Sequence, residues 1–348
     1  MNSNRTLPEL ISDEQQLDEL LTLPSSKLVE FVPEIKSPLV ILGAGGKMGP
    51  TLAVRARRAA KEAGIDLRVV AVSRFSDASA RDWLAEREVE TISVDLLDRN
   101  GLDELPDAEN VIHLVGTKFG TSQNPSYTWA VNVLAPSHAL ERYSSARVVA
   151  LSTGNVYPLT AVSSGGSVET DPLQPVGEYG NAALGRERII EYHSRRNGTP
   201  VVLMRLNYAT DLRYGVLVDI ARKVAAGEPV DLTMGYLNCI WQGDANDMII
   251  RALPLASSPA RALNFTGPAV LSVRQIAEQF GQLLDKPVQF TGRERDEALL
   301  SNAKQSIELL GEPPTPVETV IRWTADWVRR GGRLLNKPTH FEVRDGVF

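Results

Sequence analysis

The stretch LVILGAGGKMGPT spans residues 39–51 and decides the fold. Its first four residues are apolar and typical of a buried strand, and an alanine-rich helical pattern follows at 52–62. Between them lies a turn that contains four glycines, Gly43, Gly45, Gly46 and Gly49. A strand, a glycine-rich turn and a helix in this order let the backbone approach a pyrophosphate at the helix N-terminus. The stretch therefore predicts a dinucleotide-binding turn, and an ordinary tight strand-to-helix turn is the alternative.

Length and composition place the chain among ordinary globular proteins. Its 348 residues are enough for one large or two moderate domains, and a net charge of −6 argues against a nucleic-acid or anionic-membrane partner. No apolar run approaches the ~20 residues that span a bilayer, and the polar start MNSNRTLPEL does not resemble a signal peptide. Cys239 is the single cysteine and the four histidines lack ligand spacing. We expect a reducing, cytoplasmic compartment and no metal.

Strand-like and helical patterns alternate through the first 210 residues. The apolar runs lie at 39–42, 67–72, 89–94, 111–115, 147–151 and 200–206. The helical stretches between them lie at about 52–62, 77–87, 127–143 and 178–196. Continuous apolar strands that alternate with helices indicate a parallel sheet covered on both faces. The sequence predicts a doubly wound α/β fold of the Rossmann type over residues 38–210.

The remaining segments predict three further parts. Residues 1–37 carry a helical pattern that we expect to pack on the main domain, with a disordered leader as the alternative. Residues 211–335 hold helical patterns at 216–226, 244–253, 272–285 and 317–330 and strand-like runs at 230–234 and 262–266. They predict a smaller substrate-binding region whose segments return to the Rossmann domain, with a cleft between the two. In the tail 336–348, His340, Phe341 and Arg344 could reach a neighbouring subunit or close over that cleft, and an ordinary surface-docked terminus is the alternative.

Several short motifs follow the glycine turn in a fixed order. They are Asp95-Leu96, VIHLVG at 111–116, Asn132-Val133, LSTGNVYP at 151–158, Tyr179, Arg205-x-Asn207-Tyr208 and Asn264-Phe265-x-Gly267. This ordered set runs from about residue 38 to 330 and resembles the extended short-chain dehydrogenase/reductase family, which includes sugar-nucleotide epimerases and dehydratases. The resemblance implies a hydride transfer between a nicotinamide and a hydroxyl or carbonyl carbon of a sugar nucleotide or similar polyol.

The resemblance also implies roles for individual residues. Asp95 would bond the adenine, Thr153 would orient the substrate oxygen, and Tyr179 would be the acid/base. An aspartate cap, a strand-end threonine and an amphipathic-helix tyrosine are the ordinary alternatives. The other residues that the resemblance assigns to the cofactor are the glycines of the turn with Lys47 and Met48, Leu96, Leu114, Val115, Gly116, Asn132 and Asn207, together with Tyr179 itself.

One position departs from the family pattern. The family tyrosine is followed four residues later by a lysine, and here that position holds Ala183. An ordinary tyrosine has a pKa of about 10, so only ~0.1% is phenolate at neutral pH, and a nearby cation would lower that pKa. Lys118, Arg186 or an oxidised nicotinamide could supply the charge. The alternatives are a solvated loop lysine at 118 and a helix-surface charge at Arg186.

The end of the second strand favours NADP over NAD. NAD sites usually have an acidic residue there, whereas this strand ends in Ser73-Arg74. Arg74 could pair with a 2′-phosphate, Ser73 could donate a hydrogen bond, and Lys47 would add a second positive charge nearby. Solvent-facing side chains are the alternative.

Two functions remain open at this stage. The first is an NAD(P)-dependent epimerase or oxidoreductase. The resemblance implies an acidic residue beside the strand-end Ser/Thr in dehydratases, and Gly154-Asn155 after Thr153 therefore argues mildly against dehydration. The second is a non-catalytic NADP-binding regulator or partner-binding protein, suggested by Ala183. Arg205, Arg213 or Arg274 could hold a diphosphate or lie on the surface. The resemblance further implies a homodimer through the helices at 127–143 and 178–196.

Overall fold

A seven-stranded sheet forms the centre of the molecule. The computed structural model describes residues 7–76, 78–118, 120–121 and 123–347, so the first six residues of the predicted extension, the start of the predicted helix at 77 and the last residue of the tail lie outside the described residues. The strands pair in the order β12-β7-β5-β4-β1-β2-β3, and every pair is parallel. They are β1 (Leu39–Leu42), β2 (Val69–Ser73), β3 (Glu90–Ser93), β4 (Asn110–His113), β5 (Arg147–Thr153), β7 (Val201–Leu206) and β12 (Arg261–Phe265). The predicted doubly wound parallel sheet is confirmed.

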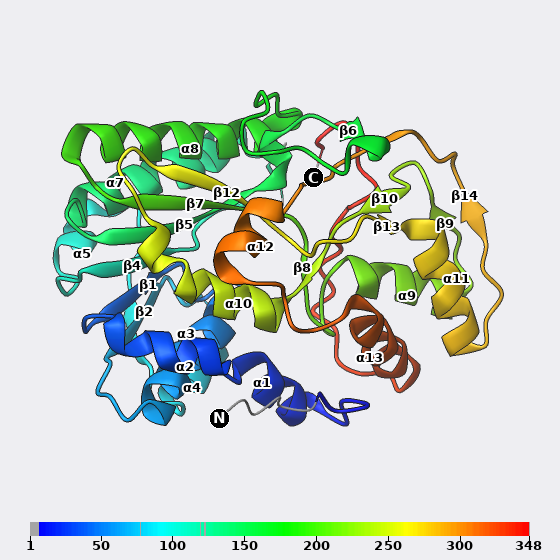
Figure 1. The fold of residues 1–348 in the computed structure, drawn as a ribbon, viewed down its shortest axis with the longest axis horizontal. Coiled ribbons are helices and arrows are strands. Elements are labelled where there is room, and N and C mark those ends of the chain that lie inside the picture. The colour runs from blue at the N-terminus through cyan, green and yellow to red at the C-terminus, as the bar shows by residue number, and fades with distance from the viewer. Residues whose placement is uncertain (1–6, 77, 119, 122, 348) are drawn as a thin grey trace.

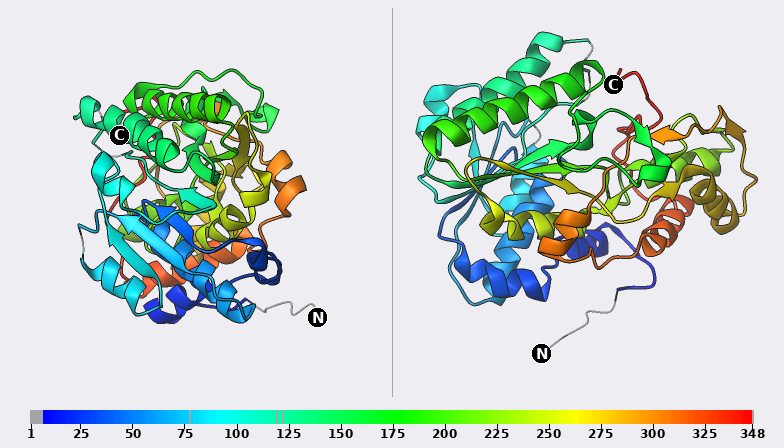
Figure 2. Two further views of the ribbon diagram at one scale, coloured as in Figure 1. Left: turned by 90° about the vertical axis from the view of Figure 1, so that its left-hand side faces the viewer. Right: turned by 45° about the horizontal axis from the view of Figure 1, so that its top comes forward.

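Successive side chains of a strand belong to different cores, because they point to opposite faces of the sheet. In β1, Leu39 and Ile41 join one cluster of buried side chains, whereas Val40 and Leu42 join another. Helices cover both faces, as Figures 1 and 2 show. One layer holds α5 (Arg99–Asp103), α7 (Ala135–Arg142) and α8 (Gly177–Asn197), and the other holds α2 (Ser26–Phe31), α3 (Gly49–Glu62), α4 (Ala78–Ala85) and α10 (Gln242–Arg251).

The smaller region is a helical layer with its own core. Its helices are α9 (Val216–Ala226), α11 (Val273–Leu284) and α13 (Val317–Arg329). They lie on the right of Figure 1, around buried aromatic side chains that include Phe280 and Trp323. Two short strand pairs border this layer: β9 (Val230–Asp231) with β14 (Phe290–Thr291), and β10 (Tyr236–Leu237) with β13 (Leu271–Ser272).

Parts of this C-terminal half return to the main sheet. The predicted strand-like run 262–266 forms β12, which pairs with β7 at the sheet edge. The helix α10 packs on α3, and α12 (Lys304–Leu310) packs against β12. The remaining short strands join distant segments: β8 (Ala209–Thr210) pairs with β11 (Ile240–Trp241), and β6 (Thr160–Ala161) pairs with β15 (Glu297–Ala298).

The N-terminal extension connects the two parts. Leu28 of α2 belongs to the core beneath the main sheet, as expected, but Leu17 and Leu21 of α1 (Glu14–Thr22) belong to the core of the smaller region. The buried Arg55 of α3 donates to the carbonyl oxygens of Leu20 and Leu21. Its guanidinium also lies 3.2 Å from the carboxylate of Asp247 on α10. The expectation that the extension packs on the main domain therefore holds for α2 and also for α1, which packs on α3 and in addition buries Leu17 and Leu21 in the core of the smaller region.

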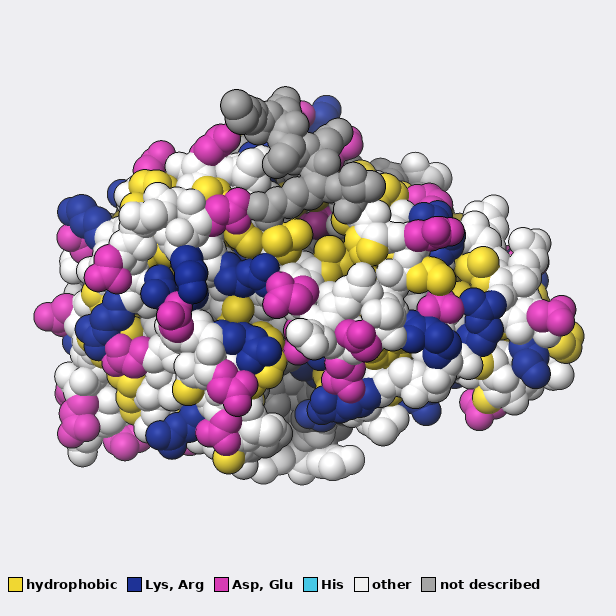
Figure 3. Space-filling view, turned by 90° about the horizontal axis from the view of Figure 1, so that it is seen from below, with side chains coloured by type: hydrophobic (Ala, Val, Ile, Leu, Met, Phe, Trp, Pro, Cys, Tyr) yellow, Lys and Arg dark blue, Asp and Glu magenta, His cyan; other side chains and the backbone are white. Residues whose placement is uncertain are grey.

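The surface carries charges of both signs. Figure 3 shows Lys and Arg side chains interspersed with Asp and Glu side chains over the lower face, with small apolar areas between them. In the part of the chain that the structure describes, no helix is both long enough and apolar enough to cross a membrane.

Candidate functional site

The glycine turn lies where the strand order reverses. β1 pairs with β2 on one side and with β4 on the other, and ligands of open α/β sheets bind at this kind of switch point. Gly43 has a φ of +83°, and a Cβ there would lie 2.7 Å from the Val115 side chain. A Cβ at Gly49 would clash with the backbone of Ala44, whereas the nearest atom to a Cβ at Gly46 is the Gly43 oxygen at 3.3 Å. Gly43 and Gly49 thus serve the packing of the turn, and a Cβ at Gly46 would meet a single neighbouring atom.

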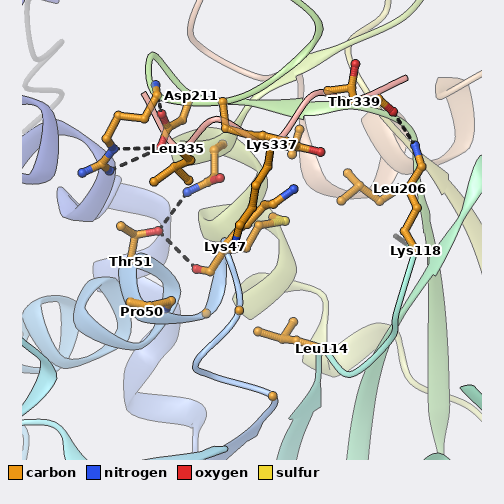
Figure 4. A pocket seen from close by; sticks show the side chains of 18 of the residues that line it. Lys47, Pro50, Thr51, Leu114, Lys118, Leu206, Asp211, Leu335, Lys337 and Thr339 are labelled. Carbon is orange, nitrogen blue, oxygen red and sulfur yellow. Dashed lines mark hydrogen bonds and ion pairs between the residues drawn. The ribbon is translucent and has the colours of Figure 1, made fainter. Parts of the chain in front are cut away.

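Two adjoining cavities meet at this turn. The larger one, of about 1070 Å³, extends over the carboxyl ends of β1, β4, β5 and β7. The smaller one, of about 280 Å³, lies beyond the ends of β2 and β3. Figure 4 shows the larger cavity with the glycine turn below it and the C-terminal tail above it.

The predicted site residues divide between these cavities. Lys47, Met48, Gly49, Lys118, Thr153, Tyr179 and Asn207 line the larger cavity only. Ser73, Arg74, Asp95, Leu96 and Val115 line the smaller cavity only. Gly43, Gly45, Gly46, Leu114 and Gly116 line both. Asn132 is fully buried and lines neither.

Three predicted catalytic residues converge in the larger cavity. Tyr179 comes from the first turn of α8, Thr153 ends β5, and Lys118 follows β4. The Lys118 Nζ lies 6.0 Å from the centroid of the Tyr179 ring and donates to the Thr339 carbonyl oxygen at 3.0 Å. Burial lowers the pKa of the Lys118 ammonium to about 8, although Asp219 opposes this shift. The Thr153 hydroxyl accepts hydrogen bonds from the backbone and side chain of Asn155.

The position of the missing lysine is closed by apolar packing. Ala183 is fully buried and packs with Val156 and Tyr157 beside the end of β5. No cation stands at this position of α8, and the Lys118 ammonium lies 6.0 Å from the centroid of the Tyr179 ring.

Arg186 lies inside the protein, so the alternative of a helix-surface charge is wrong. Its guanidinium donates to the carbonyl oxygen of Val115 at 3.1 Å and to the Asn132 side chain at 3.3 Å. Asn132 sits in η2 (Ala130–Leu134), a π-helical turn between α6 (Pro125–Trp129) and α7 that interrupts the predicted helix 127–143. A Cβ at Gly116 would clash with the Arg186 guanidinium. Asn132 and Arg186 thus support the cavity floor from below.

Buried next to this floor is His113. It ends β4, and neither of its ring nitrogens has a hydrogen-bond partner in the structure. Burial and the charge of Arg186 lower the pKa of His113 to about 3. The imidazole is therefore neutral across the physiological range.

The other arginines considered for a diphosphate are paired. Arg205 is buried and forms an ion pair with Glu187 at 2.7 Å, so it is neither a surface charge nor a ligand of the cavity. Arg213 lines the cavity between Asp18 and Asp211, at 2.9 and 3.2 Å. Arg274 pairs with Glu294 at 3.2 Å and lines neither cavity.

Lys47 lies in a different place from the one expected. Its ammonium is 3.3 Å from the centroid of the Tyr214 ring in the larger cavity, whereas Arg74 lines the smaller one. Burial, and then the charges of Lys337 and Lys118, lower the pKa of Lys47 to about 7. The expectation that Lys47 adds to the charge around Arg74 is therefore wrong.

The Arg74 guanidinium is held by its neighbours. It donates to the Tyr127 hydroxyl at 2.6 Å and lies 3.9 Å from the Asp95 carboxylate. Asp95 also accepts a hydrogen bond from the backbone N–H of Leu97. The Ser73 hydroxyl faces the turn, since a Cβ at Gly45 would lie 2.7 Å from it.

Sequence reasoning missed most of the upper wall of the cavity. The tail contributes Lys337 and Thr339, and α1 contributes Asp18 at the rim. Thr339 donates to the Asp219 carboxylate from both its backbone and its hydroxyl. Residues 336–339 of the tail thus cover the cleft, whereas the three tail residues considered for closure, His340, Phe341 and Arg344, do not line the cavity. No local pattern in the tail indicates this, because Thr339 bonds to Lys118 and Asp219, which are both more than a hundred positions away.

Comparisons with known proteins agree with this architecture. The profile of the NAD dependent epimerase/dehydratase family matches residues 39–234. No curated protein sequence matches the chain significantly. Among solved structures, a UDP-glucose 4-epimerase from Thermotoga maritima with UDP-glucose is similar at 16% identity, with a TM-score of 0.69 and coverage of 84% of this chain and 99% of that one.

Two further structures have the same fold. An epimerase from Methanothermobacter thermautotrophicus has 17% identity and a TM-score of 0.71, and the match covers 88% of this chain and 96% of that one. A dTDP-glucose 4,6-dehydratase from Streptomyces venezuelae, with NAD bound, has 18% identity and a TM-score of 0.70, and the match covers 84% and 97%.

We predict that replacing His113 reduces the sensitivity of the protein to acid. The unfolded chain protonates this histidine below its ordinary pKa of about 6.5, whereas the folded chain holds it neutral down to about 3. Its contribution to stability is complete above pH 6.5 and falls by about 1.4 kcal/mol per pH unit below it. From pH 7 to 5 the native protein loses about 2 kcal/mol through this group, and His113→Leu does not. Urea unfolding at both pH values measures this, and an equal loss in the variant contradicts it.

Proposed function

This chain belongs to the NAD dependent epimerase/dehydratase family, and on that premise we propose an NAD(P)-dependent epimerase or oxidoreductase. The reaction would transfer hydride between a nicotinamide and a hydroxyl or carbonyl carbon of a sugar nucleotide or related polyol. The observation that carries the proposal is the convergence of Tyr179, Thr153 and Lys118 in one cavity beside the glycine turn.

The residues of the turn fit a dinucleotide. A Cβ at Gly46 would meet only the oxygen of Gly43, so the backbone there is open to a pyrophosphate. The adenosine half would lie in the smaller cavity beside Asp95 and Leu96, and the nicotinamide half in the larger one beside Tyr179. When bound, the nicotinamide supplies the hydride acceptor or donor.

We favour NADP as the form bound. The end of β2 offers Ser73 and Arg74 in place of an acidic residue, and both line the smaller cavity. The bond from Arg74 to Tyr127 keeps the guanidinium at that cavity, where it could pair with a 2′-phosphate. The family and the neighbour from Streptomyces are described with NAD, which is the alternative.

Tyr179 would move the proton of the substrate hydroxyl. A base works best when its pKa lies near the working pH, and an ordinary phenol is far above it. The Lys118 ammonium lies 6.0 Å from the centroid of the Tyr179 ring and would place a positive charge beside the proton that is transferred. The hydroxyl of Thr153, held by Asn155, would orient the substrate oxygen. Lys118 thus supplies the positive charge that the family lysine would supply at the position of Ala183.

Ala183 also supports a second candidate function. A chain that binds NADP without catalysis could have lost the lysine at no cost, and it would act as a regulator or partner-binding protein. Retention of Tyr179 and Thr153 around the same cavity favours the enzyme.

We further propose a homodimer. Exposed apolar side chains occur on the two helical runs expected at the interface: Trp129 of α6 and Leu134 of η2 are 41% and 51% exposed, and Tyr192 of α8 is 51% exposed. Their burial against a second copy would remove apolar surface from water.

One prediction of this function concerns the cofactor. Arg74→Gln should weaken NADP⁺ binding by about 10- to 100-fold, because it removes a charge-assisted hydrogen bond to the 2′-phosphate. NAD⁺ binding should not change. Titration calorimetry measures both, with Arg81→Gln on the exposed face of α4 as the control. Tighter binding of NAD⁺ than of NADP⁺ by the native protein would refute the preference.

The second concerns catalysis. Tyr179→Phe should lower turnover by about 10²- to 10⁴-fold while the dinucleotide affinity stays the same, because only proton transfer is lost. Lys118→Arg, which keeps the charge, should retain more activity than Lys118→Gln. The readout is the nicotinamide absorbance with a panel of sugar nucleotides, sugars and sugar acids. Dinucleotide binding without turnover of any panel member would favour the regulator.

The third concerns assembly. The native protein should sediment as a dimer at micromolar concentration, and Leu134→Glu should sediment as a monomer because it places a charge in the apolar interface. Leu283→Glu, at a residue of α11 that is 38% exposed, is the matched control. A native monomer would contradict the proposal.

A further inference from the structure

Three lysines from separate segments converge on the larger cavity. Lys47 comes from the glycine turn, Lys118 from the loop after β4 and Lys337 from the C-terminal tail, and all three line the cavity. Figure 4 shows Lys47 and Lys337 close together, with Lys118 approaching from the strand side. The charges of Lys337 and Lys118 are near enough to contribute to the lowered pKa of Lys47. Like charges gathered in a poorly hydrated cavity repel one another, and a bound anion would remove that repulsion.

The acidic side chains that line the cavity lie beside arginines. Among the described residues these acids are Glu14, Asp18 and Asp211. Arg213 lies 2.9 Å from Asp18 and 3.2 Å from Asp211, and Arg333 lies 3.0 Å from Glu14. The remaining cations that line the cavity are the three lysines.

Two acids outside that lining, Asp219 and Glu342, also act on Lys118. The charge of Asp219 partly opposes the lowered pKa values of Lys47 and Lys118. The Asp219 carboxylate accepts two hydrogen bonds from Thr339, which stands between it and the cavity. The cavity therefore presents an excess of positive charge next to Tyr179.

The tail also limits the size of the substrate. Leu335 donates to the Arg213 carbonyl oxygen, Phe341 is 1% exposed in the core of the smaller region, and Arg344 donates to the carbonyl oxygens of Thr233 and Glu297. These contacts fix the tail between the cavity and α9. From residue 215 to 332, Gln242 is the one described residue that lines the cavity.

The volume agrees with a small substrate. Ordinary ligand pockets measure about 300–1,000 Å³. Here a cavity of about 1070 Å³ must hold the nicotinamide half of a dinucleotide as well as the substrate. Because the tail closes the side toward α9, a nucleotide attached to the sugar has no room in that direction.

We propose that the substrate is a compact anionic polyol, a sugar acid or a sugar phosphate, whose oxyanion binds among Lys47, Lys118 and Lys337. This inference rests on the proposed function, since it assigns the substrate class of the same site. Lys337 is then a specificity residue that lies outside the family-matched residues 39–234.

The test is titration calorimetry on the full chain saturated with dinucleotide, at constant ionic strength. The probes are D-glucuronate, D-glucose 6-phosphate, neutral D-glucose and UDP-glucose. Saturation matters because it removes any response of the lysines to the dinucleotide pyrophosphate. We expect glucuronate or glucose 6-phosphate to bind at least tenfold more tightly than glucose, and the tighter of the two identifies a carboxylate or a phosphate as the group recognised.

Substitution of Lys337 tests whether the affinity for the anion depends on the C-terminal tail. Lys337→Gln should weaken binding of the preferred anion about tenfold or more and leave the affinities for glucose and for the dinucleotide unchanged. Lys337→Arg should restore binding, and Lys304→Gln, at an exposed lysine of α12, should have no effect.

Three results would overturn the proposal: neither anion binds more tightly than glucose, Lys337→Gln binds the anion like the native protein, or UDP-glucose binds more tightly than both anions. The proposed function fails by a different result. If no dinucleotide binds, the dinucleotide-dependent enzyme is refuted, and the same probes are then titrated into the unloaded protein. An anion preference that depends on Lys337 in that titration would still support the anion site.

Discussion

Parallel pairing of seven strands brings all of their carboxyl ends to one edge of the sheet, and the rest of the molecule is arranged over that edge. Gly43 follows β1, Lys118 follows β4, Thr153 ends β5 and Asn207 follows β7, so residues from distant parts of the sequence share one cavity. None of these residues needs a long-range contact of its own to arrive there. The ladder hydrogen bonds and the two buried faces of each strand already determine the position of its end.

A second layer of interactions keeps this edge rigid from below. Arg186 and Asn132 bond to each other and to the loop after β4, and Gly116 lies directly against the guanidinium. The side of the cavity floor that faces the protein interior therefore carries polar and charged side chains. The side that faces the cavity is formed by backbone. Because Arg186 is buried beneath the floor, its charge acts on His113 and lowers the pKa of that imidazole.

Much of this architecture could be predicted from the sequence, and the reason is local. Apolar runs of four to seven residues and the glycines between 43 and 49 determine strands and the turn through their own burial and backbone needs, so the sheet and most helices were predicted. Lys118 could be nominated because it lies three residues past a predicted strand end. Arg186 and Arg205 could not be placed, since a buried arginine depends on partners such as Asn132 and Glu187 that no spacing reveals. Lys337 was missed for the same reason.

The contact between the two ends of the described chain has a consequence for the order of folding. Trp323 of α13 donates to the carbonyl oxygens of Pro8 and Glu9, and Arg330 donates to that of Ser12. These bonds close loops of more than 300 residues, whereas β1, α3 and β2 are neighbours in the sequence. A chain synthesised from its N-terminus can complete the glycine turn early, but residues 8–12 have to wait for α13, and Leu17 and Leu21 of α1 have to wait for the core of the smaller region. The rim of the cavity is thus among the last parts to form. It is complete only after the two ends of the described chain are in contact.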